Sequence, residues 1–178
     1  MRVAIITLTL LLWVQPVWGD GLSDIWSGIV AQQRGDHAEA IAAFTRAADS
    51  DGISTKNLAI ALSNRGKSYE ALHDYDRAVE DYTRSIALQP ENPTIYYNRG
   101  NARAQWGNLE QAISDYDKAV ELKPDYAVAY FNRGYVYNRL GYLDKAVQDF
   151  VRAYDLDPSN PRHSATMAGL RRRGLVPQ

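Results

Sequence analysis

Apolar residues recur along this chain at the spacing of amphipathic helices. In residues 127–160, Tyr130, Gly134 and Tyr137 fall at i, i+4 and i+7, so they share one face of a helix. Gly141 follows, and a second apolar series with helical spacing begins after it. Because glycine readily adopts the left-handed conformation that ends many helices, this segment is predicted to form two helices joined by a short turn.

The same pattern occurs in three consecutive copies, residues 59–92, 93–126 and 127–160, which align without a gap. The shared columns are Asn64-Arg65-Gly66, Asn98-Arg99-Gly100 and Asn132-Arg133-Gly134; Ala78, Ala112 and Ala146; Tyr82, Tyr116 and Phe150; and Pro90, Pro124 and Pro158. One helix pair of this kind cannot bury its apolar face alone. The copies are therefore predicted to stack into an array.

The third copy resembles the tetratricopeptide repeat (TPR) signature, in which seven positions have fixed residue types, and it matches six of them. The matching residues are Tyr130, Gly134, Tyr137, Ala146, Phe150 and Pro158. The resemblance implies an all-α fold, a TPR-type α-solenoid of antiparallel helix pairs.

The chain around the three clear copies completes the predicted array. Residues 21–54 keep Gly35 and Phe44 in register and are interpreted as a degenerate copy. Four additional residues, 55–58, are expected to lengthen the loop that leaves it. Residues 161–173 are expected to form a C-terminal capping helix.

One column departs from the family pattern, because arginine replaces the usual leucine. A buried and unpaired guanidinium is costly, so each arginine needs a partner. Antiparallel packing about the turn glycine places the residue sixteen positions later opposite each arginine. We therefore predict the structural ion pairs Arg65–Asp81, Arg99–Asp115 and Arg133–Asp149. The degenerate copy has Ser27 and Ala43 in these columns, which favours a structural role over binding of an anionic ligand.

The resemblance also implies a concave groove lined by the first helix of each copy. The candidate ligand-binding residues at its groove positions are Asn64, Lys67, Tyr97, Asn98, Asn101, Phe131, Asn132, Tyr135 and Arg139. An asparagine amide both donates and accepts hydrogen bonds, which suits an extended peptide, and aromatic residues are common at interfaces. Alternatively, the asparagines brace neighbouring helices and the aromatic residues fill spaces between copies.

Some proteins of this family bind acidic tails with a clamp of basic residues and asparagines. Here Ser63, Thr94 and Val128 stand where basic residues would contribute, which disfavours such a clamp. Lys67 and Arg139 could still hold one acidic end of a ligand.

The first nineteen residues differ from the rest. Arg2 precedes an apolar run from Val3 to Val14, and small residues follow Pro16, which is typical of a signal peptide cleaved after Gly19. The apolar run is shorter than the ~20 residues that span a bilayer. We expect a periplasmic or secreted protein without stable membrane insertion after cleavage, the alternative being an uncleaved anchor.

Composition excludes several classes of function. The formal net charge is −1, which is untypical of proteins that bind nucleic acids. The absence of cysteine excludes disulfides and thiolate metal sites, and the three histidines are widely spaced. No catalytic constellation and no phosphate-binding glycine loop is present. We expect no enzyme activity, no metal and no cofactor.

The sequence therefore predicts a non-catalytic scaffold or adaptor of the cell envelope, which binds a protein or an extended peptide in its groove. The alternative is a self-associating structural subunit of an envelope assembly or secretion complex, and hence a homo-oligomer.

Overall fold

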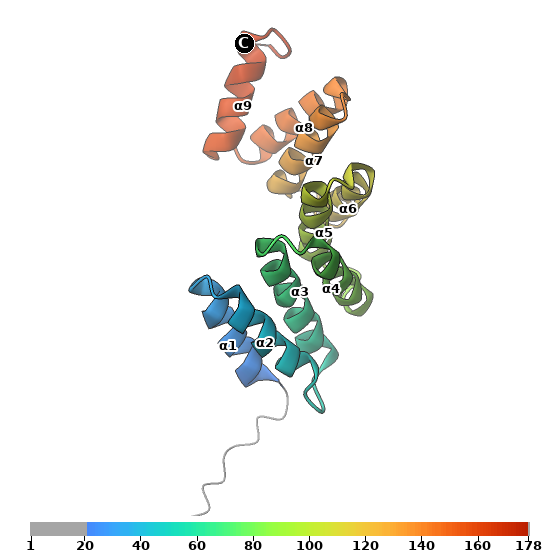
Figure 1. Cartoon of the computed structure of the whole chain (residues 1–178). Helices are drawn as coiled ribbons and strands as arrows, with labels where there is room; N and C mark the ends of the chain where they lie inside the picture. The colour runs from blue at the N-terminus through green and yellow to red at the C-terminus, as the bar shows by residue number, and fades with distance from the viewer. Residues whose placement is uncertain (1–20, 178) are drawn as a thin grey trace, which may run out of the picture.

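The computed structural model describes residues 21–177, which fold into α-helices without a strand. The helices stack along one axis, from α1 at one end to α9 at the other (Figure 1). Their bounds are α1 Leu22–Gln33, α2 His37–Ala48, α3 Thr55–Ala71, α4 Tyr75–Leu88, α5 Pro93–Trp106, α6 Leu109–Leu122, α7 Ala127–Arg139, α8 Leu143–Leu156 and α9 Pro161–Arg172. The predicted signal peptide, residues 1–19, lies outside the described residues.

Consecutive helices pair as hairpins, α1 with α2, α3 with α4, α5 with α6 and α7 with α8. Each hairpin packs against the next, and α9 packs against α8 at the C-terminal end (Figure 1). The prediction of an all-α solenoid of antiparallel helix pairs is confirmed. Within residues 21–177, no helix has the length and the apolar composition needed to cross a membrane.

The odd-numbered helices form the inner row of the stack. Each of α1, α3 and α5 contacts the next odd-numbered helix as well as its own hairpin partner. In the described part of the chain, no contact of that extent joins consecutive even-numbered helices. The first helices of the hairpins therefore converge on one side, which is the concave surface of the solenoid.

Helix ends follow from capping and turn residues. Asn92 and Asn160 accept hydrogen bonds from backbone N–H groups two residues later, and a proline directly after each opens α5 and α9. The hairpin turns require a positive φ, which Gly107 adopts at 96° and Gly141 at 81°. His73 fills the same column in the second hairpin with a φ of 62°, a conformation that is uncommon for a residue with a side chain.

The expectation that residues 55–58 lengthen a loop is wrong. These residues form the first turn of α3, which runs for 17 residues from Thr55. The Ser54 side chain accepts a hydrogen bond from the Asn57 N–H and so caps the N-terminus of α3. This cap lies before residue 59, where the 34-residue period places the start of the copy. The additional residues extend an inner helix by one turn.

Helices of one hairpin approach closely where glycine faces an aromatic ring. A Cβ atom on Gly100 would lie 2.8 Å from Cε1 of Tyr116, which is closer than carbon atoms normally approach. Gly66 faces the ring of Tyr82 in the same way. Both rings are buried, so glycine in this column makes the room that the rings fill.

The three predicted ion pairs are present. Each guanidinium donates from Nε and Nη2 to both oxygens of its carboxylate, the bidentate geometry that arginine favours. The arginine side chains are 13–15% exposed and the aspartates 3–8%. The shortest distance is 2.7 Å in Arg65–Asp81, in Arg99–Asp115 and in Arg133–Asp149.

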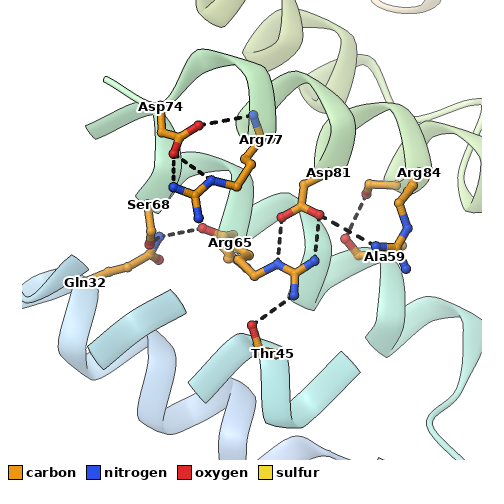
Figure 2. A network of polar contacts seen from close by, with 11 residues as sticks. Gln32, Thr45, Ala59, Arg65, Ser68, Asp74, Arg77, Asp81 and Arg84 are labelled. Atoms are coloured by element: carbon orange, nitrogen blue, oxygen red, sulfur yellow. Dashed lines mark hydrogen bonds and ion pairs between the residues drawn. The ribbon is translucent and has the colours of Figure 1, made fainter. Parts of the chain in front are cut away.

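The third guanidinium nitrogen, Nη1, reaches the preceding hairpin, which the sequence analysis did not predict. It donates over 2.9 Å from Arg65 to Thr45, over 3.0 Å from Arg99 to Thr83 and over 2.6 Å from Arg133 to Asp117. Figure 2 shows Arg65 of α3 between Asp81 of α4 and Thr45 of α2. Each arginine thus joins three helices from two hairpins.

Replacing Asp115 with alanine is expected to lower the free energy of unfolding by about 3–5 kcal/mol, because a buried partner is lost. The Asp115 side chain is 3% exposed and accepts hydrogen bonds from Arg99 and, over 2.8 Å, from Arg103. Urea denaturation followed by circular dichroism measures the change.

Glu121→Ala is the matched control, because Glu121 lies on the same helix and pairs with Lys118 but is 67% exposed and outside the arginine network. It is expected to change stability by under about 1 kcal/mol. If Asp115→Ala cost no more than this control, the buried pair would not stabilise the array.

Candidate ligand-binding surface

The candidate groove residues all lie on the inner row of helices, so the structure places them on the concave side. Asn64 and Lys67 belong to α3, Tyr97, Asn98 and Asn101 to α5, and Phe131, Asn132, Tyr135 and Arg139 to α7. The structure does not leave all of them open to a ligand. Their hydrogen bonds and exposure separate residues that hold the helices together from residues that face the groove.

Asn101 and Asn132 hold neighbouring helices together. Nδ2 of Asn132 donates to Oδ1 of Asn101 over 2.9 Å and to the Tyr97 hydroxyl over 3.1 Å. The same Oδ1 of Asn101 accepts a hydrogen bond from the Tyr116 hydroxyl over 2.8 Å. This network joins α5, α6 and α7, which is the bracing role given above as the alternative for the asparagines.

The asparagine ladder of the three copies is not uniform. Nδ2 of Asn64 donates to the Ile60 carbonyl of its own helix over 2.9 Å. The backbone carbonyl of Asn64 accepts a hydrogen bond from Nε2 of Gln32. The same nitrogen also donates to the Ser68 hydroxyl (Figure 2). By contrast, Asn98 is 9% exposed and its Nδ2 has no hydrogen-bond partner among the described residues. That nitrogen is itself buried, so it is an unsatisfied donor, which is costly, and not a donor that faces the groove.

The expectation that Phe131 lies open in the groove is wrong. Its side chain is 7% exposed, with ring centroids 5.3 Å from Phe150 and 5.0 Å from His163. His163 belongs to α9, so the capping helix covers this ring. Tyr97 is half-buried, because its ring packs between the rings of Tyr116 and Tyr126.

Tyr135 is the aromatic candidate that stays open, with 55% of the residue exposed. It lines a pocket of about 300 Å³ between α5 and α7, which we call the inner pocket. Arg139 and, from α9, Arg162 line the same pocket. A smaller hollow of about 100 Å³ lies between α3 and α5, lined in part by Asn64 and Lys67.

Glu70 also lies on the inner row, and its hydrogen bonds between hairpins were not predicted from the sequence. Its carboxylate accepts hydrogen bonds from the Tyr82 hydroxyl over 3.1 Å and from Nε2 of Gln105 over 2.6 Å. Burial raises the pKa of Glu70, although these hydrogen bonds and the charge of Lys67 act in the opposite direction. Burial likewise raises the pKa of the Tyr82 hydroxyl. Glu70 thereby connects the second and third hairpins, and Lys67 remains exposed beside it.

Arg162 was also missed, although the repeat period contains the signal. Extending the 34-residue spacing into α9 aligns Arg162 with Val128, a groove position of the preceding copy. The helix expected to cap the open end therefore also contributes a residue to the groove. Within residues 21–177, no group of three or more histidine or acidic side chains is placed to hold a metal ion.

Two family models match the sequence. The model described as TPR repeat matches residues 66–106 and 100–141, and the model described as tetratricopeptide repeat matches residues 127–160. Together they span residues 66–160, more than half of the 178-residue chain. No curated protein matches the chain.

Solved structures share the fold. MamA is 25% identical with a TM-score of 0.72, over 81% of this chain and 76% of that chain. The first TPR of Spaghetti (RPAP3), bound to the HSP90 peptide SRMEEVD, is 28% identical with a TM-score of 0.63, over 68% and 96%. The TPR domain of Arabidopsis OM64 is 27% identical with a TM-score of 0.64, over 67% and 99%.

Three observations agree: the repeated columns of the sequence, the stacked helix hairpins and the two family models. The chain therefore belongs to the tetratricopeptide repeat family.

Proposed function

We propose that the protein is a non-catalytic scaffold of the cell envelope that binds a protein or an extended peptide along its concave surface. The observation that carries this proposal is the inner pocket, where Tyr135 is 55% exposed on a row of helices that is otherwise tightly braced. TPR repeat proteins are typically non-catalytic scaffolds, and one structural neighbour holds a peptide.

The concave surface offers two kinds of contact to a partner. Tyr135 supplies an exposed ring of the type that dominates many interfaces. Lys67 on α3 and Arg139 on α7 supply exposed positive charge on the same row of helices. A partner that lies across α3, α5 and α7 can therefore use both.

The variant Tyr135→Ala tests the groove. Truncation of an interface aromatic residue costs about 2 kcal/mol, so recovery of the partner from an envelope extract is expected to fall about tenfold or more. Tyr142→Ala is the matched control, because Tyr142 is 54% exposed but lies at the hairpin turn before α8. If all three proteins recovered every partner equally, the binding surface would lie elsewhere.

Location in the periplasm, or secretion, is the second part of the proposal and rests on the sequence of residues 1–19. N-terminal sequencing of the protein isolated from its native cells is expected to begin at Asp20, because cleavage after Gly19 fits the small residues at that point. A protein that begins at Met1 in the membrane fraction would indicate the uncleaved anchor. Met1 in the cytoplasmic fraction would contradict export altogether.

Self-association is a second candidate function, favoured by the surface of α1. Trp26 is 66% exposed and Val30 44%, and both line a hollow of about 590 Å³ at the N-terminal end of the stack. The C-terminal end carries α9 as a cover, whereas no described helix covers this face of α1. Terminal faces of repeat arrays are normally polar, so exposed apolar residues here suit contact with a second copy.

Light scattering of the purified protein is expected to show an apparent mass that rises with concentration, and Trp26→Ser is expected to abolish the rise. Trp106→Ser is the control, since Trp106 is 47% exposed at the end of α5. A monomer mass at every concentration would rule out self-association.

A further inference from the structure

The N-terminal end of the array exposes a column that every later copy buries. Val30 of α1 is 44% exposed. With the additional turn of α3 taken into account, its column holds the buried residues Ser68, Ala102, Val136 and Leu170. This column packs against the preceding hairpin, as Val136 of α7 does against Ala112 and Tyr116 of α6. Val30 therefore presents a packing position to solvent, and Trp26, one turn earlier, is 66% exposed beside it.

Helix α9 covers the other end of the stack only in part. A hollow of about 660 Å³ remains between α7, α8 and α9, and we call it the C-terminal hollow. Its apolar lining is Leu143, Val147, Phe150, Leu170 and Leu175. Leu143 is 55% exposed and Leu175 46%. Phe150 is only partly buried, whereas Tyr82 and Tyr116 in the same column are fully buried.

The C-terminal hollow is open because a glycine stands where another copy has a ring. With the 34-residue period extended into α9, Gly169 falls in the column of Tyr135, which lines the inner pocket one copy earlier. A Cβ atom on Gly169 would meet only Nη2 of Arg172, at 4.0 Å. The C-terminal hollow thus has room for an aromatic side chain that its own copy does not supply.

The two ends of the array also carry opposite charge. Residues 21–54 contain five acidic and two basic residues, which gives a net charge of −3. Residues 161–177 contain four arginines and no acidic residue, which gives +4. Opposite charges favour the approach of one copy's N-terminal end to another's C-terminal end, and like charges oppose the pairing of two equal ends. A second copy of this chain therefore suits the C-terminal hollow in both charge and apolar character.

We propose that copies of this protein associate head to tail, with Trp26 and Val30 of one copy seated in the C-terminal hollow of the next. This proposal rests on the self-association given above as the second candidate function, and it names the two surfaces that meet. The interface joins two different surfaces, so each added copy leaves one free end of each kind. Because the surfaces lie at opposite ends of the stack, each added copy lengthens the array (Figure 1).

Two variants each block one end. Trp26→Ser removes the ring that enters the hollow, and Gly169→Tyr fills the hollow with the ring that its column carries one copy earlier. Neither change strains the fold, because Trp26 is exposed and tyrosine is a better helix former than glycine. Leu175→Ser, at an exposed lining residue, is a second and independent block of the tail.

Sedimentation velocity measures the association. Each blocked variant is expected to need about tenfold or more of the concentration at which the unaltered protein associates, since an aromatic anchor is lost or excluded. Ala165→Tyr is the matched control for Gly169→Tyr, because Ala165 is exposed on the same helix but does not line the hollow. Trp106→Ser, on α5, is the control for Trp26→Ser. Both controls are expected to associate as the unaltered protein does.

Mixing the two blocked variants tests the direction of the contact. Trp26→Ser keeps an intact tail and Gly169→Tyr keeps an intact head, so the mixture has one working interface. It is expected to form a species of two chains and to grow no further, although each variant alone stays monomeric at the same concentration.

Four results would overturn the proposal. If Gly169→Tyr and Leu175→Ser associate like the unaltered protein, or if the mixture stays monomeric, the head-to-tail contact is wrong while self-association stands. If the unaltered protein is monomeric at every concentration, both fail. If it is monomeric and Gly169→Tyr lowers recovery of another protein from an envelope extract, the C-terminal hollow belongs to that partner.

Discussion

The arginine that follows the asparagine of each clear copy fixes the geometry on which the rest of this protein depends. Two of its nitrogens bind the aspartate of the same hairpin and the third binds the hairpin before it. A guanidinium is planar and rigid, so these three bonds set both the approach of the paired helices and the step to the preceding pair. Repeat arrays are held together by contacts between nearest neighbours, and this side chain serves both kinds of contact at once.

The ends of the array show that the charges belong to this linking role. Within residues 21–177 no hairpin packs before the first one to offer an acceptor, and its columns hold Ser27 and Ala43. In the same residues α9 pairs with no second helix that could supply an aspartate, and the arginine column holds the buried Met167. A charge in the core is favourable only with its full set of partners. Where one partner is missing, the sequence replaces the charge with a neutral residue.

The sequence predicts the helix pairs and the ion pairs because both repeat with a fixed period. In every 34-residue copy, residues sixteen positions apart lie opposite each other. The ion pair between Arg99 and Asp115 can therefore be predicted from the spacing alone. What breaks the period is harder to predict. Residues 55–58 became helix because Ser54 caps an additional turn, and Phe131 became buried because α9 brings His163 onto its ring. Both outcomes depend on tertiary contacts at places where one copy differs from the next.

The asparagines illustrate a further limit, since one residue type in one column has different roles in successive copies. Asn64 bonds to its own helix, Asn132 bonds to α5, and Asn98 keeps an unbonded amide nitrogen. Sequence identifies the column, but neighbours such as Ile60 and Tyr97 decide the hydrogen bonds. The side chains of the inner row thus divide into those that brace the helices and those that stay open. Groups that brace the helices lose their freedom during folding, so a ligand does not have to order them again. The open groups, Tyr135 and the two arginines of the inner pocket, then stand on a braced surface, and the proposed binding would depend on those few side chains.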